Sequence, residues 1–567
     1  MARSSYQPMS SWRLNLVKVA FITVVIILIA YLVDMQLHEA DFLQKQAKSR
    51  HQRNIDIVAH RGMILDRHGE PLAISSPVHS VWVNPQHFEP SREQLKKLGQ
   101  VLNITAGQLQ GKLKNTATKH FVYIQRGVSP DIASAVKALK IPGLALQREY
   151  KRYYPAGEVT AHILGFTNID DKGQEGVELS HNAQLEGTNG KKRMYRNGIG
   201  QFVEGGTLLK KEKDGENIQL SIDLRLQYLT YQALKQAVNH HKAASGSAVI
   251  VDVNTGEVLA MANQPTFNPN NRRALHAADY RNRAVTDLFE PGSTIKPFII
   301  ASALKSKKFT TASIIDTSPG IFKVGTHTIK DFRDYGQIDL TTLIQKSSNI
   351  GATKVALAME PDQLWQDIQR FGFGLATGAY FPGEVLGYMP EPESWQVLDR
   401  ATMAYGYGLA STTLQLARAY TILANGGKAY PLRFLKATQA PSGEQIYSKQ
   451  VTKKVMAMME AVTQAGGTST RAAVDNYRVA GKSGTAKKMA ANGRDYAENN
   501  YQSVFAGMIP ASDPKLAMVI MIDDPQGEEY YGGLVAAPVF SKVMTSAMRI
   551  LNITPDNVEP MRNGASR

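Results

Sequence analysis

The chain has 567 residues and carries 65 Lys and Arg against 49 Asp and Glu, a formal net charge of +16. A single hydrophobic core stops growing at about 250–300 residues, so this length predicts two or more domains. The absence of cysteine excludes thiolate metal sites; it fits an oxidising compartment but does not by itself locate the protein.

Residues 19–37 contain an apolar run that predicts a membrane-spanning helix. The run is about long enough to cross a bilayer, with its flanking residues reaching the interface. No small-x-small site follows it, which disfavours the alternative of a cleaved signal peptide. No acidic residue precedes Asp34, whereas three basic residues do (Arg3, Arg13 and Lys18). The positive-inside rule therefore predicts a cytoplasmic tail over 1–18, a single-pass type II anchor and export of the remainder.

The predicted export affects how the positive charge is interpreted. A basic protein is a candidate for nucleic-acid binding, but export argues against it, and we expect no nucleic acid as a partner. Anionic lipid surfaces and polymers bearing carboxylates are more natural counter-charges. A solvated basic surface with no dedicated partner is the alternative.

Residues 54–213 are predicted to form a mixed α/β module, and no catalytic chemistry is evident there. It contains a strand-like run at 80–83, amphipathic helices over 92–102 and 130–140, and many glycine turns. The polar, charged stretch from Lys210 to Asn217 suits a domain boundary.

Residues 218–552 are predicted to form a second, α+β domain. A hairpin is indicated by two apolar runs joined through the turn Asn254-Thr255-Gly256. The middle of the domain is largely helical, and the tail over 553–567 is polar and expected to be disordered. The predicted strands cover 218–222, 248–253, 257–261, 477–480, 503–509 and 516–522, and the predicted flanking helices cover 223–240 and 538–551.

Three strings in this domain supply the parts that serine acyl transfer without a histidine needs. A lysine one helical turn after a serine lies beside its hydroxyl, and it can take the proton if burial or a neighbouring cation keeps the amine partly neutral. A second hydroxyl and an amide can bridge nucleophile, lysine and substrate. A further cation beside a segment that backbone can approach closely suits a substrate carboxylate. The strings are Ser293-Thr294-Ile295-Lys296, Ser347-Ser348-Asn349 and Lys482-Ser483-Gly484-Thr485.

The first string is weak alone, because Ser-x-x-Lys occurs four times, starting at Ser134, Ser293, Ser302 and Ser512. Ser134 lies beside the apolar stripe of an amphipathic helix, and Ser302 falls well inside a helix. Ser293 follows Glu290-Pro291-Gly292, which breaks the preceding structure, so it is predicted at a helix start. Free N–H groups there favour negative charge at the serine oxygen. A simple helix N-cap is the alternative.

Competing interpretations of the strings have less support. Gly481-Lys482-Ser483 resembles the end of a phosphate-binding loop, but Asn476 stands where that loop needs its first glycine. A serine hydrolase with a histidine relay is disfavoured because no Gly-x-Ser-x-Gly occurs. Metal chemistry is disfavoured because there is no cysteine and no His-Glu-x-x-His, and the pair His240-His241 is expected to be solvated.

The three strings, in this order and spacing, resemble the active-site signature of penicillin-binding transpeptidases and serine β-lactamases. Residues 243–263 resemble the first hairpin of that fold, and 289–297 its nucleophile segment. Upstream, the segments 61–69, 152–158 and 173–178 resemble the non-catalytic module of class B penicillin-binding proteins. The chain is therefore identified as a member of class B, most similar to the division-specific D,D-transpeptidases of Gram-negative bacteria. One departure is Ser483, where many members have threonine.

The resemblance implies a fold and a set of roles. The fold is a single transmembrane helix, a non-catalytic pedestal or dimerisation-like module, and a penicillin-binding transpeptidase domain with an antiparallel sheet between helical layers. Ser293 would attack the penultimate carbonyl of a stem peptide ending in D-Ala-D-Ala, with Lys296 as its base. The oxyanion hole would be the backbone N–H groups of Ser293 and Thr485. The remaining roles are a proton relay through Ser347, orientation by Asn349, and carboxylate binding by Lys482, Ser483, Gly484 and Thr485.

The resemblance also implies a location and partners. The protein would sit in the inner membrane with its catalytic domain in the periplasm. It would act on peptidoglycan stem peptides or their lipid-linked precursor, work with a membrane glycan polymerase and other division proteins, and be trapped by β-lactams without any metal or organic cofactor. An elongation-specific class B transpeptidase, a D,D-carboxypeptidase or β-lactamase-like hydrolase, and a penicillin sensor would use the same residues.

Overall fold

The computed structural model describes residues 10–37, 41–42, 45, 52–196, 202–272, 276–439, 441–489 and 496–557. The chain divides into two compact units, one formed by 1–60 with 187–215 and the other by 61–186 with 216–567. The module predicted over 54–213 contributes residues to both units. Its two ends belong to the first unit, and its middle packs in one unit with the second predicted domain.

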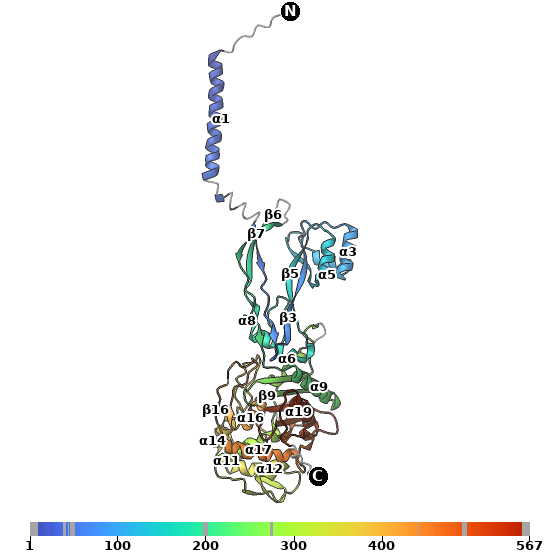
Figure 1. Ribbon diagram of the computed structural model, residues 1–567, viewed down its shortest axis with the longest axis vertical. Coiled ribbons are helices and arrows are strands. Elements are labelled where there is room, and N and C mark those ends of the chain that lie inside the picture. The colour runs from blue at the N-terminus through green and yellow to red at the C-terminus, as the bar shows by residue number, and fades with distance from the viewer. Residues whose placement is uncertain are drawn as a thin grey trace, which may run out of the picture. The chain divides into compact units, whose positions relative to one another are not determined.

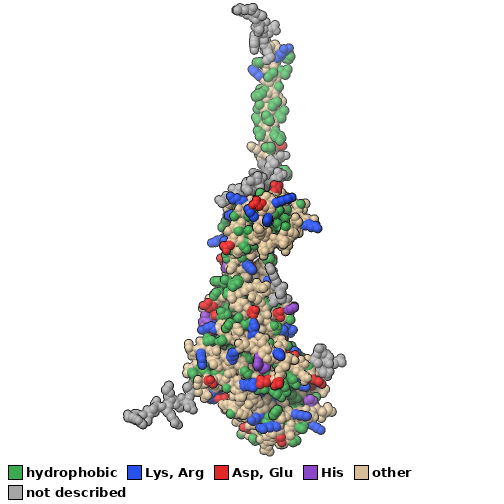
Figure 2. Space-filling model, turned by 90° about the vertical axis from the view of Figure 1, so that its right-hand side faces the viewer, with side chains coloured by type: hydrophobic (Ala, Val, Ile, Leu, Met, Phe, Trp, Pro, Cys, Tyr) green, Lys and Arg blue, Asp and Glu red, His purple; other side chains and the backbone are tan. Residues whose placement is uncertain are grey.

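Helix α1 (Ser11–Leu37) contains the predicted membrane span. Its 27 residues extend about 40 Å at 1.5 Å per residue, enough to cross a bilayer. Apolar side chains are exposed along its length (Figure 2), which fits a single-pass membrane anchor. The helix begins at Ser11, so the predicted tail over 1–18 includes its first turns, and residues 1–9 of that tail lie outside the described residues.

The first unit also holds a three-stranded antiparallel sheet with β6 in the centre. Its strands are β1 (Gln52–Ile57), β6 (Gly190–Arg196) and β7 (Phe202–Lys210).

The second unit begins with a sheet in which the long strand β3 (Pro71–Val83) pairs with β4 on one side and β5 on the other. The helix predicted over 92–102 is present with those bounds, and its N-terminus is closed by a capping box between Ser91 and Gln94. The other elements are β2 (Ile64–Leu65), β4 (Val122–Val128), β5 (Leu144–Tyr153), α3 (Arg92–Leu102), α4 (Ala106–Leu113), α5 (Pro130–Ala138), η1 (Gly157–Val159), α6 (Ala161–Leu164), α7 (Gly176–Ser180) and α8 (Asn182–Glu186).

A buried charge cluster holds this region together. Arg61 and Arg152 are 1% and 5% exposed, and each forms an ion pair of 2.6 Å with the fully buried carboxylate of Glu178. Removing one partner of a buried ion pair strands the other charge, so these residues are structural. They come from the three segments that carried the resemblance in this region.

The second predicted domain is built on a five-stranded antiparallel sheet in the order β10-β9-β19-β18-β17. Residues of β9 alternate between two cores: Val249 and Val251 face one, Ala248 and Ile250 the other. Helices cover both faces of the sheet, so strands such as β9 and β19 are buried on both faces, and their sequences contain continuous apolar runs rather than alternating ones. The strands are β9 (Ser245–Asp252), β10 (Val258–Gln264), β17 (Ala480–Met489), β18 (Tyr496–Ile509) and β19 (Leu516–Asp523).

One face of the sheet packs on α9 (Leu224–His240) and α19 (Ala537–Ile550), which lie side by side in Figure 1. The other face packs on a helical half that contains α11 (Lys296–Lys305), α16 (Thr413–Ala424) and α17 (Lys449–Thr463). The domain is therefore the predicted sandwich of a sheet between helical layers.

The remaining elements complete the helical half and its small sheets. They are β8 (Ile218–Gln219), η2 (Ala277–Tyr280), α10 (Arg283–Thr286), η3 (Gly292–Ile295), β11 (Ile314–Asp316), β12 (Ile321–Val324), β13 (His327–Lys330), β14 (Gln337–Asp339), α12 (Leu340–Lys346), α13 (Asn349–Leu357), α14 (Pro361–Arg370), η4 (Pro392–Ser394), α15 (Val397–Met403), β15 (Lys428–Ala429), β16 (Glu444–Gln445), η5 (Thr470–Ala472) and α18 (Gly532–Val535).

Two predicted boundaries need correction. The strand predicted at 477–480 begins at Ala480 and continues to Met489, because pairing with β18 overrides the poor strand propensity of its glycines. The tail predicted to be disordered from 553 is held to the domain through residue 557. Asp556 accepts hydrogen bonds from Arg478 N (2.7 Å) and Ser512 Oγ (2.7 Å), and residues 558–567 lie outside the described residues.

Candidate active site

Ser293 lies in a short 3-10 turn, η3, that runs directly into α11 at Lys296. The cap position of α11 is Ile295, so Ser293 is not a simple N-cap of that helix. Pro297 stands in the first turn of α11, where a missing N–H costs nothing. The turn gives Ser293 partial exposure, while Lys296 is completely buried.

The Lys296 ammonium is held by the second string, 51 to 53 residues away in sequence. It donates to the Ser347 carbonyl oxygen (2.6 Å), to Ser347 Oγ (3.2 Å) and to Asn349 Oδ1 (2.7 Å). Ser347 ends α12 with a left-handed backbone (φ 60°), and Ser348 caps α13 by accepting from Gly351 N. The break between the two helices therefore presents the Ser347 hydroxyl and the Asn349 amide to the lysine.

Lys482 reaches the same hydroxyl from β17, the edge strand of the sheet. Its ammonium donates to Ser347 Oγ (2.9 Å) and to the Ser483 carbonyl oxygen (2.9 Å), and its side chain is fully buried. Side chains alternate along a strand, so Ser483 and Thr485 project from the opposite face of β17 to Lys482, and both are half-buried. Thr485 Oγ1 accepts from Gly532 N (3.0 Å), which leaves its O–H free to donate.

Burial and mutual repulsion shift the pKa values of the two lysines. Desolvation, followed by the positive charge of Lys482, lowers the pKa of Lys296 well below its usual value, while Asp331 opposes this. Desolvation lowers the pKa of Lys482 to about 7. Burial and the neighbouring charge of Lys482 therefore favour the neutral form of Lys296 that a general base requires.

Close backbone contacts bring the nucleophile turn against β17. A Cβ on Gly484 would lie 2.5 Å from the Pro291 carbonyl oxygen, so only glycine fits there. Gly406 has a φ of 92°, and a Cβ on it would lie 2.0 Å from the Gly292 carbonyl oxygen. The turn carrying Ser293 is therefore packed between the strand of the third string and the Tyr405–Gly408 segment.

Asp331 is a site residue that the sequence analysis missed. Its carboxylate accepts from Asn349 N (2.5 Å), Ile350 N (3.1 Å) and Ser348 Oγ (2.5 Å). It thereby fixes the start of α13 and the orientation of the second string. Nothing in the sequence distinguishes it from the other acidic residues, because its partners lie 17 to 19 positions downstream.

Glu290 is a second residue near the site to which the sequence analysis gave no role of its own. It accepts from Gly408 N (2.8 Å) and Tyr496 OH (3.1 Å), and burial raises its pKa. Glu290 therefore ties the chain just before the Ser293 turn to the Tyr405–Gly408 segment and to β18.

The other Ser-x-x-Lys matches are engaged in structural contacts. Ser302 Oγ donates to Asp367 (2.6 Å) in the buried core, and Lys305 bonds the same carboxylate. Ser134 Oγ donates to the Pro130 carbonyl within an exposed turn of α5, and Ser512 donates to the Asp556 carboxylate through its backbone N–H and its Oγ. Of the four, only Ser293 stands beside the other two strings.

Two family models match the chain. The one described as "Penicillin binding protein transpeptidase domain" matches residues 246–545, and the one described as "Penicillin-binding Protein dimerisation domain" matches residues 56–220.

Relatives match over nearly the whole chain. It is 43% identical to a probable peptidoglycan D,D-transpeptidase, PbpC, of Pseudomonas aeruginosa over 97% of both chains. It is 41% identical to the peptidoglycan D,D-transpeptidase FtsI of Escherichia coli K12, over 96% of this chain and 93% of that one.

Solved structures agree. The transpeptidase domain of Burkholderia pseudomallei penicillin-binding protein 3 is 39% identical, covers 60% of this chain and 98% of that one, and has a TM-score of 0.55. A peptidoglycan synthetase from Bifidobacterium adolescentis is 26% identical, covers 90% and 98%, and has a TM-score of 0.70. The fold and the site define a serine acyltransferase of the penicillin-binding type. The chain belongs to the penicillin-binding protein transpeptidase family, among its class B peptidoglycan D,D-transpeptidases.

Proposed function

We propose that Ser293 is the acylated nucleophile of this transpeptidase and Lys296 its general base. The observation that carries the proposal is the convergence of two buried ammonium groups, Lys296 and Lys482, on the single hydroxyl of Ser347. Burial, followed by the charge of Lys482, lowers the pKa of Lys296, which favours the neutral amine that accepts the serine proton.

In the acylation step, Ser293 Oγ attacks the penultimate carbonyl carbon of a stem peptide ending in D-Ala-D-Ala, and its proton passes to the neutral amine of Lys296. The backbone N–H groups of Ser293 and Thr485 stabilise the oxyanion, a contribution of about 3 kcal/mol per donor. Collapse of the tetrahedral intermediate breaks the C–N bond, and the proton reaches the leaving D-alanine nitrogen through Ser347. Asn349, bonded to Lys296, orients the lysine and the substrate amide.

The substrate carboxylate is proposed to lie along β17. The hydroxyls of Ser483 and Thr485 donate to it, Gly484 leaves room for its approach, and Lys482 supplies positive charge from beneath the strand. A bound carboxylate would favour the charged form of Lys482, opposing the desolvation that lowers its pKa to about 7.

Transfer is completed when the amine of a neighbouring stem peptide attacks the Ser293 ester. That attack forms the cross-linking amide and returns the proton to serine oxygen. β-Lactams, whose ring amide mimics the D-Ala-D-Ala bond, would leave a ring-opened acyl ester on Ser293, which for a penicillin is the penicilloyl ester.

We further propose that the domain acts in the periplasm at the division septum of the inner membrane. Support comes from α1, which fits a single-pass anchor, and from whole-length similarity to FtsI proteins of E. coli and Buchnera. Lipid-linked precursor, a membrane glycan polymerase and other division proteins are the partners this role requires.

Mapping the penicillin adduct tests the nucleophile. The full-length protein, labelled with penicillin and digested, should carry the adduct on Ser293 alone, with Ser293→Ala unlabelled and Ser302→Ala labelled normally. An adduct on Ser134 or Ser302 would disprove the assignment.

A second measurement separates transfer from hydrolysis. The penicilloyl ester should persist for many minutes, and a thioester stem-peptide analogue should turn over faster when a D-amino acid is added. Release of penicilloic acid within seconds would indicate a lactamase, and turnover indifferent to any acceptor amine would indicate a carboxypeptidase.

A further inference from the structure

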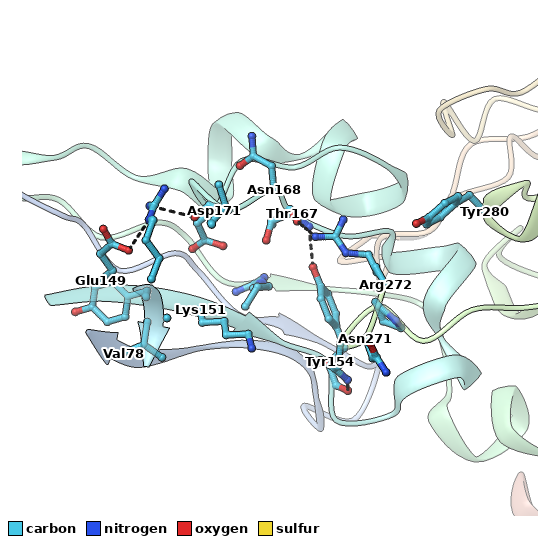
Figure 3. A pocket seen from close by; sticks show the side chains of 17 residues that line it. Val78, Glu149, Lys151, Tyr154, Thr167, Asn168, Asp171, Asn271, Arg272 and Tyr280 are labelled. Carbon is cyan, nitrogen blue, oxygen red and sulfur yellow. Dashed lines mark hydrogen bonds and ion pairs between the residues drawn. The ribbon is translucent and has the colours of Figure 1, made fainter. Parts of the chain in front are cut away.

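A cavity of about 940 Å³ lies in the second unit, between the pedestal strands and the transpeptidase domain (Figure 3). Its floor comes from β3 and β5, one wall from the loop 167–171, and one end from Pro269–Arg272 with Tyr280. Its volume falls in the range of small-ligand sites, about 300–1,000 Å³. None of the predicted active-site residues lines it, so it is a separate site.

Two charged side chains that line this cavity have buried atoms without hydrogen-bond partners. Arg152, 5% exposed, uses Nε on Glu178 (2.6 Å) and Nη1 on Ser75 (3.1 Å), but its Nη2 has no partner among the described residues. Asp171 contacts Ser75 through Oδ2 (3.5 Å) and lies near the positive charges of Arg61 and Arg152, but its Oδ1 meets no hydrogen-bond donor within the described residues. Buried polar atoms in folded proteins are nearly always hydrogen-bonded. The donor Arg152 Nη2 and the acceptor Asp171 Oδ1 could therefore bond to a ligand in the cavity.

Two further cations line the cavity with N–H groups to spare. Lys151 is exposed on β5, and no side-chain partner for it is found in the part of the chain that the structure describes. Arg272 stacks over the Phe166 ring (4.2 Å to the centroid) and, among the described residues, donates only to the Thr167 carbonyl oxygen (3.0 Å). Thr167 N donates in turn to the Tyr154 hydroxyl, so both side chains are fixed at the same residue (Figure 3).

The two carboxylates that line the cavity differ in how many of their oxygens are already hydrogen-bonded. Glu149 is already engaged by Ser80, Tyr123 and Arg126, whereas Asp171 retains a free oxygen. Unused hydrogen-bonding capacity therefore remains on Arg152 Nη2, on Lys151, on Arg272 and on Asp171 Oδ1. That set matches a ligand with a carboxylate and a nearby N–H, and the carboxylates would repel the second charge of a phosphate.

We propose that this cavity binds a short peptide, with a peptide carboxylate held by Arg152 and Arg272 and a peptide N–H donating to Asp171. Lys151, whose side chain leaves β5 on the opposite face to that of Arg152, adds positive charge to the lining. The rings of Tyr154 and Tyr280 supply apolar surface for the rest of the chain. The carboxylate has two possible sources, the free end of a wall peptide and an acidic segment of a protein partner. The first source rests on the proposed function, and the second does not.

Fluorescence anisotropy on the full-length protein in detergent tests the proposal, after penicillin has acylated Ser293 to close the active site. One labelled probe is a stem-peptide analogue ending in D-Ala-D-Ala with a free carboxylate. The other is Ala-Glu-Ala-Glu-Ala with both ends blocked. We expect saturable binding of one probe, weakened about tenfold or more by Lys151→Glu and by Arg272→Glu. Lys137→Glu, on the exposed face of α5 outside the cavity, is the matched control and should not change binding.

The outcomes distinguish the two sources of the carboxylate, and they test the cavity separately from the catalytic role of Ser293. Preference for the free-acid probe assigns a wall peptide, and preference for the blocked probe assigns a protein segment. Binding of neither probe, or binding undiminished in both charge-reversed variants, overturns the proposal and leaves a water-filled cavity. If Ser293 fails to react with penicillin, the proposed catalytic role fails instead, and the two variants still report on the cavity. Unchanged thermal unfolding of each variant confirms that the fold is intact.

Discussion

Replacement of Asp331 by alanine should slow acylation although this residue is assigned no contact with the substrate. Its carboxylate accepts from Ser348 Oγ, Asn349 N and Ile350 N. A buried donor left unpaired costs about 1–3 kcal/mol, so losing three bonds at the lower value destabilises the protein by about 3 kcal/mol. Asn349 also loses its fixed position beside Lys296, and a displacement of about 1 Å in such a group lowers the rate roughly 10²-fold.

Asp331→Asn separates charge from position. The asparagine oxygen can still accept from the two backbone N–H groups, so the destabilisation falls to about 1 kcal/mol. The charge of Asp331 holds the pKa of Lys296 up, against burial and Lys482. Removing that charge lowers the pKa of Lys296 further, so the neutral amine persists to lower pH. The acidic limb of the acylation profile should therefore move to lower pH.

Stopped-flow acylation by a fluorescent penicillin, measured across the pH range for each variant, checks both effects, and thermal unfolding reports stability. Asp334→Asn is the matched control, since Asp334 is exposed in the same loop and, within the described part of the chain, accepts only from Gly336 N (2.8 Å). An acidic limb that stays in place or moves to higher pH in Asp331→Asn would refute the charge argument. Wild-type acylation by Asp331→Ala would refute the positioning argument.

Three further predictions concern the third string and the topology. Lys482→Gln should cost about 2–3 kcal/mol in acylation efficiency with the fold intact, and β-lactam esters that react with wild type as fast as the free acids would contradict its carboxylate role. Gly484→Ala should push β17 away from Pro291, whose carbonyl oxygen would lie 2.5 Å from the new Cβ, and lower acylation far more than Ala486→Gly on the same strand. Alkaline phosphatase fused after residue 60 should be active, and a stable but inactive fusion would refute export.

The sequence alone identified most of the candidate catalytic residues, because the motifs that contain them are short stretches of the chain. Ser293 and Lys296 are one helical turn apart. The preceding Glu290-Pro291-Gly292, which ends the earlier element, predicts from the sequence alone that a helix starts at Ser293. The apolar run within α1 and the strands β9, β10 and β19 are likewise set by composition over short windows. The three strands appear where the pattern predicted them within a few residues.

The tertiary structure decided what depends on residues far apart in the chain. Lys296 and Lys482 meet at Ser347 across 51 and 135 residues, and only that meeting buries both amines and lowers their pKa values. The structure also excluded Ser302 by giving it Asp367, 65 positions away, as a partner. Desolvation and hydrogen-bond satisfaction are properties of packed neighbours, so no local pattern carries them.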